Sequence, residues 1–357
     1  MRPGYKESLP AVLCALLLQA PGAAPAAEET LKSRVEAQWG ELRETTAKKW
    51  VDYSELGDSL SEVDFEKGRF EVQVLLPMEA ALPGRPAGAA LGDLSEQDLA
   101  RIKSLAEPKA AAQSLRMLSR LEPGKAPVLK DQILDPDDRF LVEAKHARRY
   151  THDHLVPAMR VADRPVTGKD GRPRVKVTAR YYLVSDHLMV RARRYSPEVA
   201  AVARSYGLDP ALIYAVIHTE SCFNPLALSK SGALGLMQLV PRHAAREAYK
   251  YLFKKDPPRS ADYLYDPKNN IRLGAAYLHM LETRHFGRLK NLVNRRTLSI
   301  AAYNCGPNRI AKDIIARYEV DKLSRAQLHA LIRKLTPVET RTYVPRVEER
   351  IDLYRKM

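Results

Sequence analysis

The feature that most constrains this chain is an apolar helix with an acidic residue in its last turn. Asp209 is a good N-cap and Pro210 suits a first turn, so the sequence predicts a helix from Pro210 that ends before Asn224-Pro225. Glu220 shares its stripe with three aliphatic residues: Ile213, Val216 and Ile217. A carboxyl group withdrawn from water has a raised pKa and can act as a general acid. The alternative from this helix alone is a Glu that points into solvent.

Three further motifs follow the helix in the sequence. They are Gly-Leu-Met-Gln at 235–238, Ala-Tyr-Asn-Cys-Gly-Pro at 302–307 and Glu-Thr-Arg-Thr-Tyr-Val at 339–344. Together with Glu-Ser-Cys-Phe-Asn-Pro at 220–225, their order resembles the lytic transglycosylases with a goose-type-lysozyme-like SLT fold. Each motif alone is a weak signal, whereas four in the same order are specific.

The resemblance implies a mainly α, lysozyme-like catalytic domain at 188–357. The region before it, 27–187, is predicted to be an α+β domain, and its segments near Trp50 and Val63 resemble the N-terminal domain of the membrane-bound lytic transglycosylase C group. Alternation predicts a β-hairpin over 63–76 and a strand over 175–182. The remaining predictions for this region are helices within 28–60, 95–105 and 138–150, and loops at 77–90 and 108–112.

In the catalytic half, further helices are predicted over 241–253 and 266–287. Capping boxes are predicted at Ser324 with Gln327 and at Thr336 with Glu339.

The family resemblance also implies a single-acid mechanism without cofactor or metal. Glu220 would protonate the oxygen between N-acetylmuramic acid and N-acetylglucosamine and then accept the proton of the muramyl C6 hydroxyl, which gives a 1,6-anhydro end. Six residues are expected to bind substrate around it: Ser221, Met237, Gln238, Tyr303, Asn304 and Tyr343.

Individual roles for these residues follow from the same resemblance. Ser221 would hold the acid or the sugar, Tyr303 would face Glu220, and Asn304 would fix its helix end. Met237 and Gln238 would line the cleft, and Tyr343 would close its far wall. The alternatives are that Met237 is a core residue and that Tyr343 only packs.

The cysteines suggest a cross-link between two of these motifs. Cys14 lies in the predicted leader, which leaves Cys222 and Cys305 in the mature chain, both where the family usually has a small residue. We therefore predict a Cys222–Cys305 disulfide in an oxidising compartment, with two buried free thiols as the alternative.

The N-terminus predicts export. Residues 1–26 read as a signal peptide, and Leu13 before Cys14 is too large for a lipobox, so we expect a periplasmic protein without a lipid anchor at Cys14. The net charge of +15 favours an acidic partner. For an exported protein this disfavours nucleic acid and favours anionic cell-wall peptides or lipid headgroups, with a solvated basic surface that has no specific partner as the alternative. The family resemblance implies peptidoglycan glycan strands as the partner, while peripheral membrane association is left open and a monomer is expected. His152 and His154 are interpreted as surface histidines.

The leading hypothesis is therefore a peptidoglycan lytic transglycosylase, a lyase. A muramidase that hydrolyses the same bond with water is one alternative. A cell-wall-binding module with an inactive cleft is another, although Glu220 and Tyr303 are both present.

Overall fold

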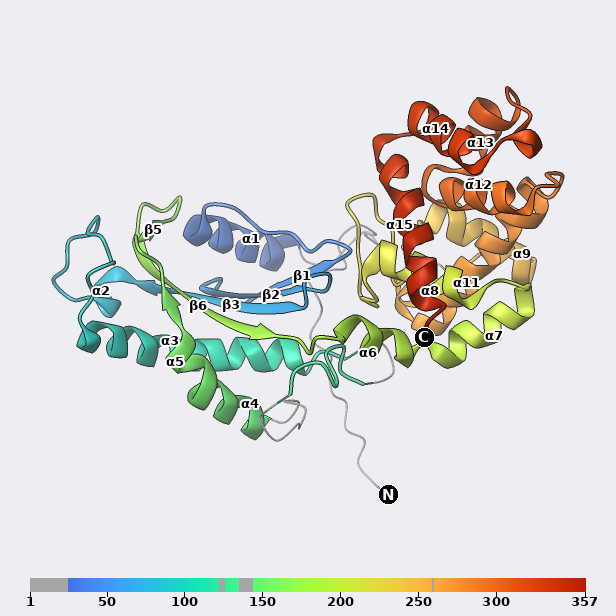
Figure 1. The fold of residues 1–357 in the computed structure, drawn as a ribbon. Helices are drawn as coiled ribbons and strands as arrows, with labels where there is room; N and C mark the ends of the chain where they lie inside the picture. Colours follow the sequence, from blue (N-terminus) through green and yellow to red (C-terminus); the bar gives the residue numbers. More distant parts are fainter. Residues whose placement is uncertain (1–24, 122–125, 135–143, 259) are drawn as a thin grey trace, which may run out of the picture.

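The computed structural model describes residues 25–121, 126–134, 144–258 and 260–357. They form a β-sheet region that precedes a helical region (Figure 1). The predicted leader with Cys14 and the first part of the helix predicted over 138–150 lie outside the described residues.

The first half is built on an antiparallel sheet. Within the described residues it has six strands, in the order β1-β2-β3-β6-β4, with β5 paired to β6. Their bounds are β1 Lys49–Tyr53, β2 Ser59–Asp64, β3 Arg69–Pro77, β4 Arg160–Val161, β5 Val166–Thr167 and β6 Pro173–Tyr182. The predicted hairpin is confirmed as β2 and β3, and the predicted strand over 175–182 is confirmed as β6.

Helices cover both faces of this sheet. The helix α1 (Pro25–Trp39) lies on one face and α3 (Glu96–Leu118) on the other (Figure 1). The larger core forms beneath α3, where alternate residues of β3 and β6 point: Phe70, Val72, Val74, Val175, Val177, Ala179 and Tyr181. Shorter helices complete this half: α2 Met78–Ala81, α4 Ala144–Tyr150, η1 Thr151–Leu155 and α5 Val156–Ala158.

Three expectations for this half are wrong. The loop predicted at 77–90 contains the short helix α2. Trp50 does not lie in a helix: it lies in β1, pairs with Val63 of β2 and is buried in the core. The loop predicted at 108–112 is part of α3, with Pro108 inside the helix. Because Pro108 is exposed, water can reach the carbonyl that loses its hydrogen-bond partner, and the helix continues.

The second half is helical. Its helices are α6 His187–Arg194, α7 Ser196–Tyr206, α8 Pro210–Ser221, η2 Pro241–Ala245, α9 Arg246–Phe253, α10 Asp262–Tyr265, α11 Pro267–Met280, η3 Leu281–His285, α12 Leu292–Cys305, α13 Pro307–Ile310, η4 Ala311–Ile315, η5 Val320–Lys322, α14 Arg325–Leu335 and α15 Val338–Tyr354. No helix among the described residues combines the length and the apolar character needed to cross a membrane.

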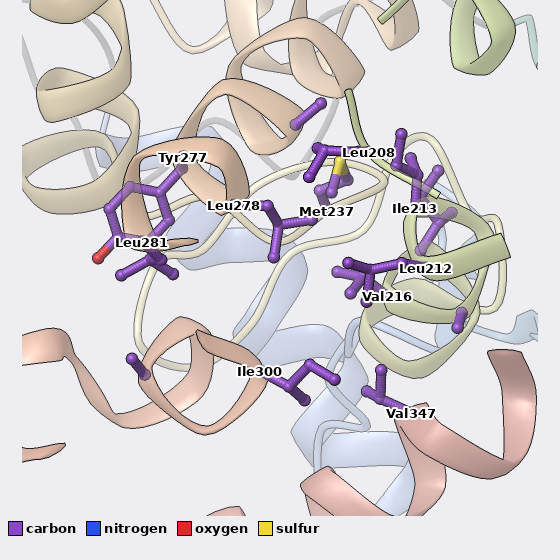
Figure 2. Close-up of a cluster of buried hydrophobic side chains, with 14 of the residues drawn as sticks. Leu208, Leu212, Ile213, Val216, Met237, Tyr277, Leu278, Leu281, Ile300 and Val347 are labelled. Carbon is purple, nitrogen blue, oxygen red and sulfur yellow. The ribbon is translucent and has the colours of Figure 1, made fainter. Parts of the chain in front are cut away.

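The helix α8 lies at the centre of the second core. Asp209 caps it as predicted, because its side chain accepts a hydrogen bond from the N–H of Ala211. Aliphatic residues of α8 share one core with residues of α11, α12 and α15 (Figure 2): Ile213 and Val216 belong to the same cluster as Leu278, Ile300 and Val347. The end of α8 is thereby held inside a packed core.

Of the two capping boxes predicted for the last helices, the structure contains one. Ser324 and Gln327 form the predicted capping box of α14. The box predicted at Thr336 and Glu339 is wrong: the Thr336 hydroxyl donates back to the carbonyl of Ile332, and Glu339 accepts a hydrogen bond from Asn304 instead.

A loop between α8 and η2 is clamped to α11 by one buried amide. Asn270 accepts a hydrogen bond from the N–H of Met237 and donates to the carbonyls of Leu234 and Leu264. Gly235 has a φ of 72°, and a Cβ there would collide with Asn270. The Gly-Leu-Met-Gln motif therefore uses its glycine to approach α11 closely.

Replacing Asn270 by Ala should lower the free energy of unfolding by about 3 kcal/mol, because it removes three hydrogen bonds to main-chain groups in a buried place. Denaturant-induced unfolding measures this change. Asn269→Ala, in the adjacent and less buried position of α11, is the matched control. Equal losses in the two variants would contradict the clamp.

Candidate active site

Glu220 occupies the last turn of α8, within the packed core. Every other residue of α8 from Ala211 to Ser221 is buried, whereas Glu220 is partly exposed. The chain then turns sharply through Cys222 and Phe223, which have φ values of 50° and 60°. Left-handed backbone costs roughly 1–2 kcal/mol at each residue that is not glycine. The turn is thus a strained feature that surrounding contacts must maintain.

Two tyrosines from distant helices approach this carboxyl group. The Tyr343 hydroxyl of α15 donates a hydrogen bond to Glu220 Oε1 at 2.7 Å. Glu220 raises the pKa of Tyr303 of α12 electrostatically, and the Tyr303 hydroxyl donates to the carbonyl of Met237 at 2.8 Å. The structure therefore brings together α8, α12, α15 and the loop that contains Met237.

The electrostatics of the site keep Glu220 protonated up to neutral pH. Burial raises its pKa from 4.5 to about 7, the Tyr343 hydrogen bond opposes this rise, and Glu339 and Lys48 act in opposite directions with smaller effects. Burial beside Glu220 also raises the pKa of Tyr303 and of Tyr343 well above 10. Both phenols are therefore neutral, and Glu220 can both give and take a proton near neutral pH.

Hydrogen bonds between α12 and α15 hold the part of the site from which Tyr343 extends. Asn304 accepts a hydrogen bond from the Thr340 hydroxyl at 2.6 Å and donates to Glu339 at 3.1 Å. Because Thr340 lies one helical turn before Tyr343, this link holds the α15 segment from which Tyr343 reaches Glu220. Gln238 is half-buried, and its amide donates to the carbonyls of Ala227 and Gly235.

Two of the expected substrate-binding side chains are placed elsewhere. Ser221 is fully buried, and its hydroxyl is directed at the carbonyls of Ile217 and Leu236, so it connects α8 to the loop and does not hold the acid or a sugar. The Met237 side chain is also fully buried and packs against Gly274, so it belongs to the core and does not line a cleft.

The predicted disulfide is wrong. Both Cys222 and Cys305 are free thiols. Cys222 packs into the core of the first half, whereas Cys305 packs against the core of the helical half. Burial raises the pKa of Cys222 to about 11, which keeps it an unreactive thiol.

Sequence reasoning missed two residues of the site. Asn270 shares a helical stripe with Leu273 and Tyr277, and a polar residue on that stripe was an available signal. Lys48, from the segment before β1, lowers the pKa of Glu220 although it belongs to the first half. No sequence pattern indicates that electrostatic interaction, because it links segments far apart in the chain.

The comparisons confirm the resemblance to lytic transglycosylases. The family model described as the transglycosylase SLT domain matches residues 198–325. Membrane-bound lytic murein transglycosylase C of Mannheimia succiniciproducens is 36% identical over 180 residues, which are 49% of this chain and 50% of the relative. The chain thus spans about half the length of the first curated relatives it matches.

A longer match reaches into the first half. The protein of the same name from Photorhabdus laumondii is 29% identical over 307 residues, which are 85% of this chain and 78% of the relative. Among solved structures, the 70-kDa soluble lytic transglycosylase of Escherichia coli is 28% identical and covers 45% of this chain and 24% of its own, with a TM-score of 0.37.

Tyr343→Phe should raise the pKa of Glu220 above its value of about 7, because the lost hydrogen bond favours the ionised form. Titration of the Glu side-chain carboxyl carbons by NMR, assigned by comparison with Glu220→Gln, measures the shift. Tyr354→Phe is the matched control, since the Tyr354 hydroxyl lies near His218 Nδ1 and not near Glu220. A lower Glu220 pKa in Tyr343→Phe would disprove the role given to this phenol.

Glu220→Gln should change how stability depends on pH. Because the folded-state pKa of Glu220 is raised from 4.5 to about 7, its stabilising contribution is fully present below pH 4.5 and is lost as the pH rises through about 7. Between about pH 4.5 and about pH 8, the free energy of unfolding of the variant should therefore rise by on the order of 3 kcal/mol relative to that of the native protein. Urea unfolding of both proteins at the two pH values tests this, and a constant difference would be inconsistent with a raised pKa.

Proposed function

We propose that this chain is a peptidoglycan lytic transglycosylase. It would cleave the β-1,4 bond between N-acetylmuramic acid and N-acetylglucosamine and leave 1,6-anhydro-N-acetylmuramic acid ends. The observation that carries the proposal is the Glu220 carboxyl, held by Tyr343 with a pKa of about 7 in a region that matches the SLT family. The names of the relatives are consistent with this activity.

Glu220 serves as acid and then as base in this reaction. Its protonated carboxyl donates to the glycosidic oxygen, and the substrate's acetamido group stabilises the positive charge that develops at C1. The Glu220 carboxylate then takes the proton of the C6 hydroxyl as that oxygen bonds to C1. The Tyr343 hydroxyl, which is 2.7 Å from Oε1, stabilises the carboxylate between the two steps.

A single carboxyl group is enough for this route. Most glycosidases use a second carboxylate to activate water or to attack the sugar. Glu339 acts on Glu220 electrostatically, but its Oε1 accepts a hydrogen bond from Asn304. A muramidase would need an activated water, instead of the C6 hydroxyl, to attack C1. Mass spectrometry separates the two reactions, because the anhydro product is one water lighter than the product of hydrolysis.

The remaining assignments belong to the same proposal. Residues 188–357 would be the lysozyme-like catalytic domain and residues 27–187 an accessory domain of the transglycosylase C type, in a periplasmic protein. Tyr303, Gln238 and Asn304 would border the bound glycan strand. Tyr303 and Gln238 are hydrogen-bonded to the loop that contains Met237, and Asn304 is hydrogen-bonded to Thr340, one turn before Tyr343, which supports this arrangement.

Glu220→Gln should abolish the release of anhydro-muropeptides from purified sacculi, because the amide cannot donate a proton as an acid does. Mass spectrometry of the soluble products measures the release. Glu282→Gln is the matched control, since Glu282 of η3 is a shielded carboxylate whose partner is Arg296. Undiminished release by Glu220→Gln would remove the basis of the proposed function.

A further inference from the structure

The turn that follows Glu220 is attached to the first half of the protein. Arg191 of α6 donates hydrogen bonds to the carbonyl of Cys222 at 3.0 Å and to the carbonyl of Phe65 at 2.7 Å. Phe65 begins the turn between β2 and β3 of the sheet. One guanidinium therefore joins the hairpin of the first half to the left-handed turn two residues after Glu220.

Arg191 is buried to an unusual degree for a cation. Its side chain is 1% exposed, and burial lowers its pKa to about 10, so it stays charged near neutral pH. Its other hydrogen bonds go to the Gln132 side-chain oxygen and to His187 Nδ1, and it lies over the Phe65 ring. All these acceptors are neutral, because burial also lowers the pKa of His187 to about 4.

Such an arrangement is costly if stability is its only purpose. A buried cation without a carboxylate partner keeps a large desolvation penalty, and apolar residues of the same volume often stabilise a core better. What the guanidinium adds is direction: its fixed fork reaches Cys222, Phe65 and Gln132 at the same time. The residue therefore specifies where the turn after Glu220 lies.

Two further contacts tie the same short segment to the first half. The Asn224 side chain donates to the carbonyl of Ala47 at 3.2 Å. On the other side of Glu220, Arg350 donates to the Thr219 hydroxyl at 2.9 Å and also pairs with Glu66, which pairs with Lys48. Residues on both sides of Glu220 are thus connected to the hairpin turn or to the segment before β1.

We propose that Arg191 is a positioning residue for Glu220, through which the first half of the protein holds the catalytic carboxyl in place. By fixing the carbonyl of Cys222, it maintains two consecutive left-handed residues that would otherwise relax. The end of α8 then keeps Glu220 at hydrogen-bond distance from Tyr343 and sheltered from water. This inference rests on the proposed function for its catalytic meaning, but its structural part can be measured without turnover.

The test compares Arg191→Met and Arg191→Lys with the unsubstituted chain. The groups that interact with Glu220 are Tyr343 and Glu339 of α15, Tyr303 of α12 and Lys48 before β1, and all of them are retained. Arg350 of α15, which binds the neighbouring Thr219, is retained as well. In Arg191→Met the turn loosens and Glu220 meets more water, so its pKa should fall from about 7 toward 4.5. Arg191→Lys keeps the positive charge but loses the forked guanidinium, so the Glu220 pKa in this variant should lie between those of the native protein and Arg191→Met.

Two readouts are taken on each variant: the Glu220 pKa by carboxyl-carbon NMR, and kcat and KM for anhydro-muropeptide release. We expect kcat to fall by about tenfold or more in Arg191→Met with KM changed by less than about threefold, and a partial recovery in Arg191→Lys. Arg194→Met is the matched control, because Arg194 lies on the same helix and donates to the carbonyls of Pro127 and Val128. It should leave the Glu220 pKa near 7 and kcat within about twofold.

The outcomes separate the inference from the function it rests on. A Glu220 pKa that stays at about 7 in folded Arg191→Met would overturn the positioning role, whatever the activity. Should that variant fail to fold, an unchanged Glu220 pKa and kcat in Arg191→Lys would overturn it equally. If the native protein released no anhydro-muropeptides, the proposed function would fall, while the Glu220 titration would still decide whether Arg191 positions the carboxyl.

Discussion

The structure depends on one unfavourable placement: a carboxyl group at the end of an apolar helix, where water reaches it only in part. Desolvation opposes ionisation of Glu220, and one phenol hydrogen bond partly restores it. The result is a pKa of about 7, which neither effect alone would give. An acid that must lose a proton and regain one within a single turnover works best at such a value. The packed core around α8 is what makes the desolvation permanent (Figure 2).

The Tyr343 hydroxyl can stabilise the Glu220 carboxylate only if different parts of the structure hold each of the two side chains in place. The position of Tyr343 depends on α15, which is hydrogen-bonded to α12 through Thr340 and Asn304. The position of Glu220 depends on α8, whose end is held by a hydrogen bond from the Ser221 hydroxyl to the carbonyl of Leu236 and by contacts of the turn that follows. A displacement of either support would alter a 2.7 Å hydrogen bond and, with it, the proton affinity of the acid.

The sequence was most informative where local rules and burial agree. Asp209 and Pro210 start α8 as capping chemistry requires, and alternation finds both strands of the β2–β3 hairpin. It was least informative where tertiary contacts decide. Trp50 joins a strand because Val63 pairs with it, and Pro108 stays in α3 because that face is solvated. Ser221 and Met237 stand in catalytic motifs, yet their side chains build the scaffold, which a motif cannot reveal. The predicted cysteine pair rests on motif position alone, whereas each thiol packs against a different core.

The two halves of the chain are not structurally independent at the turn that follows Glu220. A separate accessory domain needs only a solvated, polar interface with its neighbour. Here a fully buried guanidinium crosses the junction, and two of its acceptors are the main-chain carbonyls of Cys222 and Phe65, one in each half. Main-chain acceptors cannot be removed by substitution, so these two contacts depend on the arginine and on the shape of the two turns. Such a junction transmits position from the sheet to the end of α8, which connects the fold of the first half to the proton affinity of the acid.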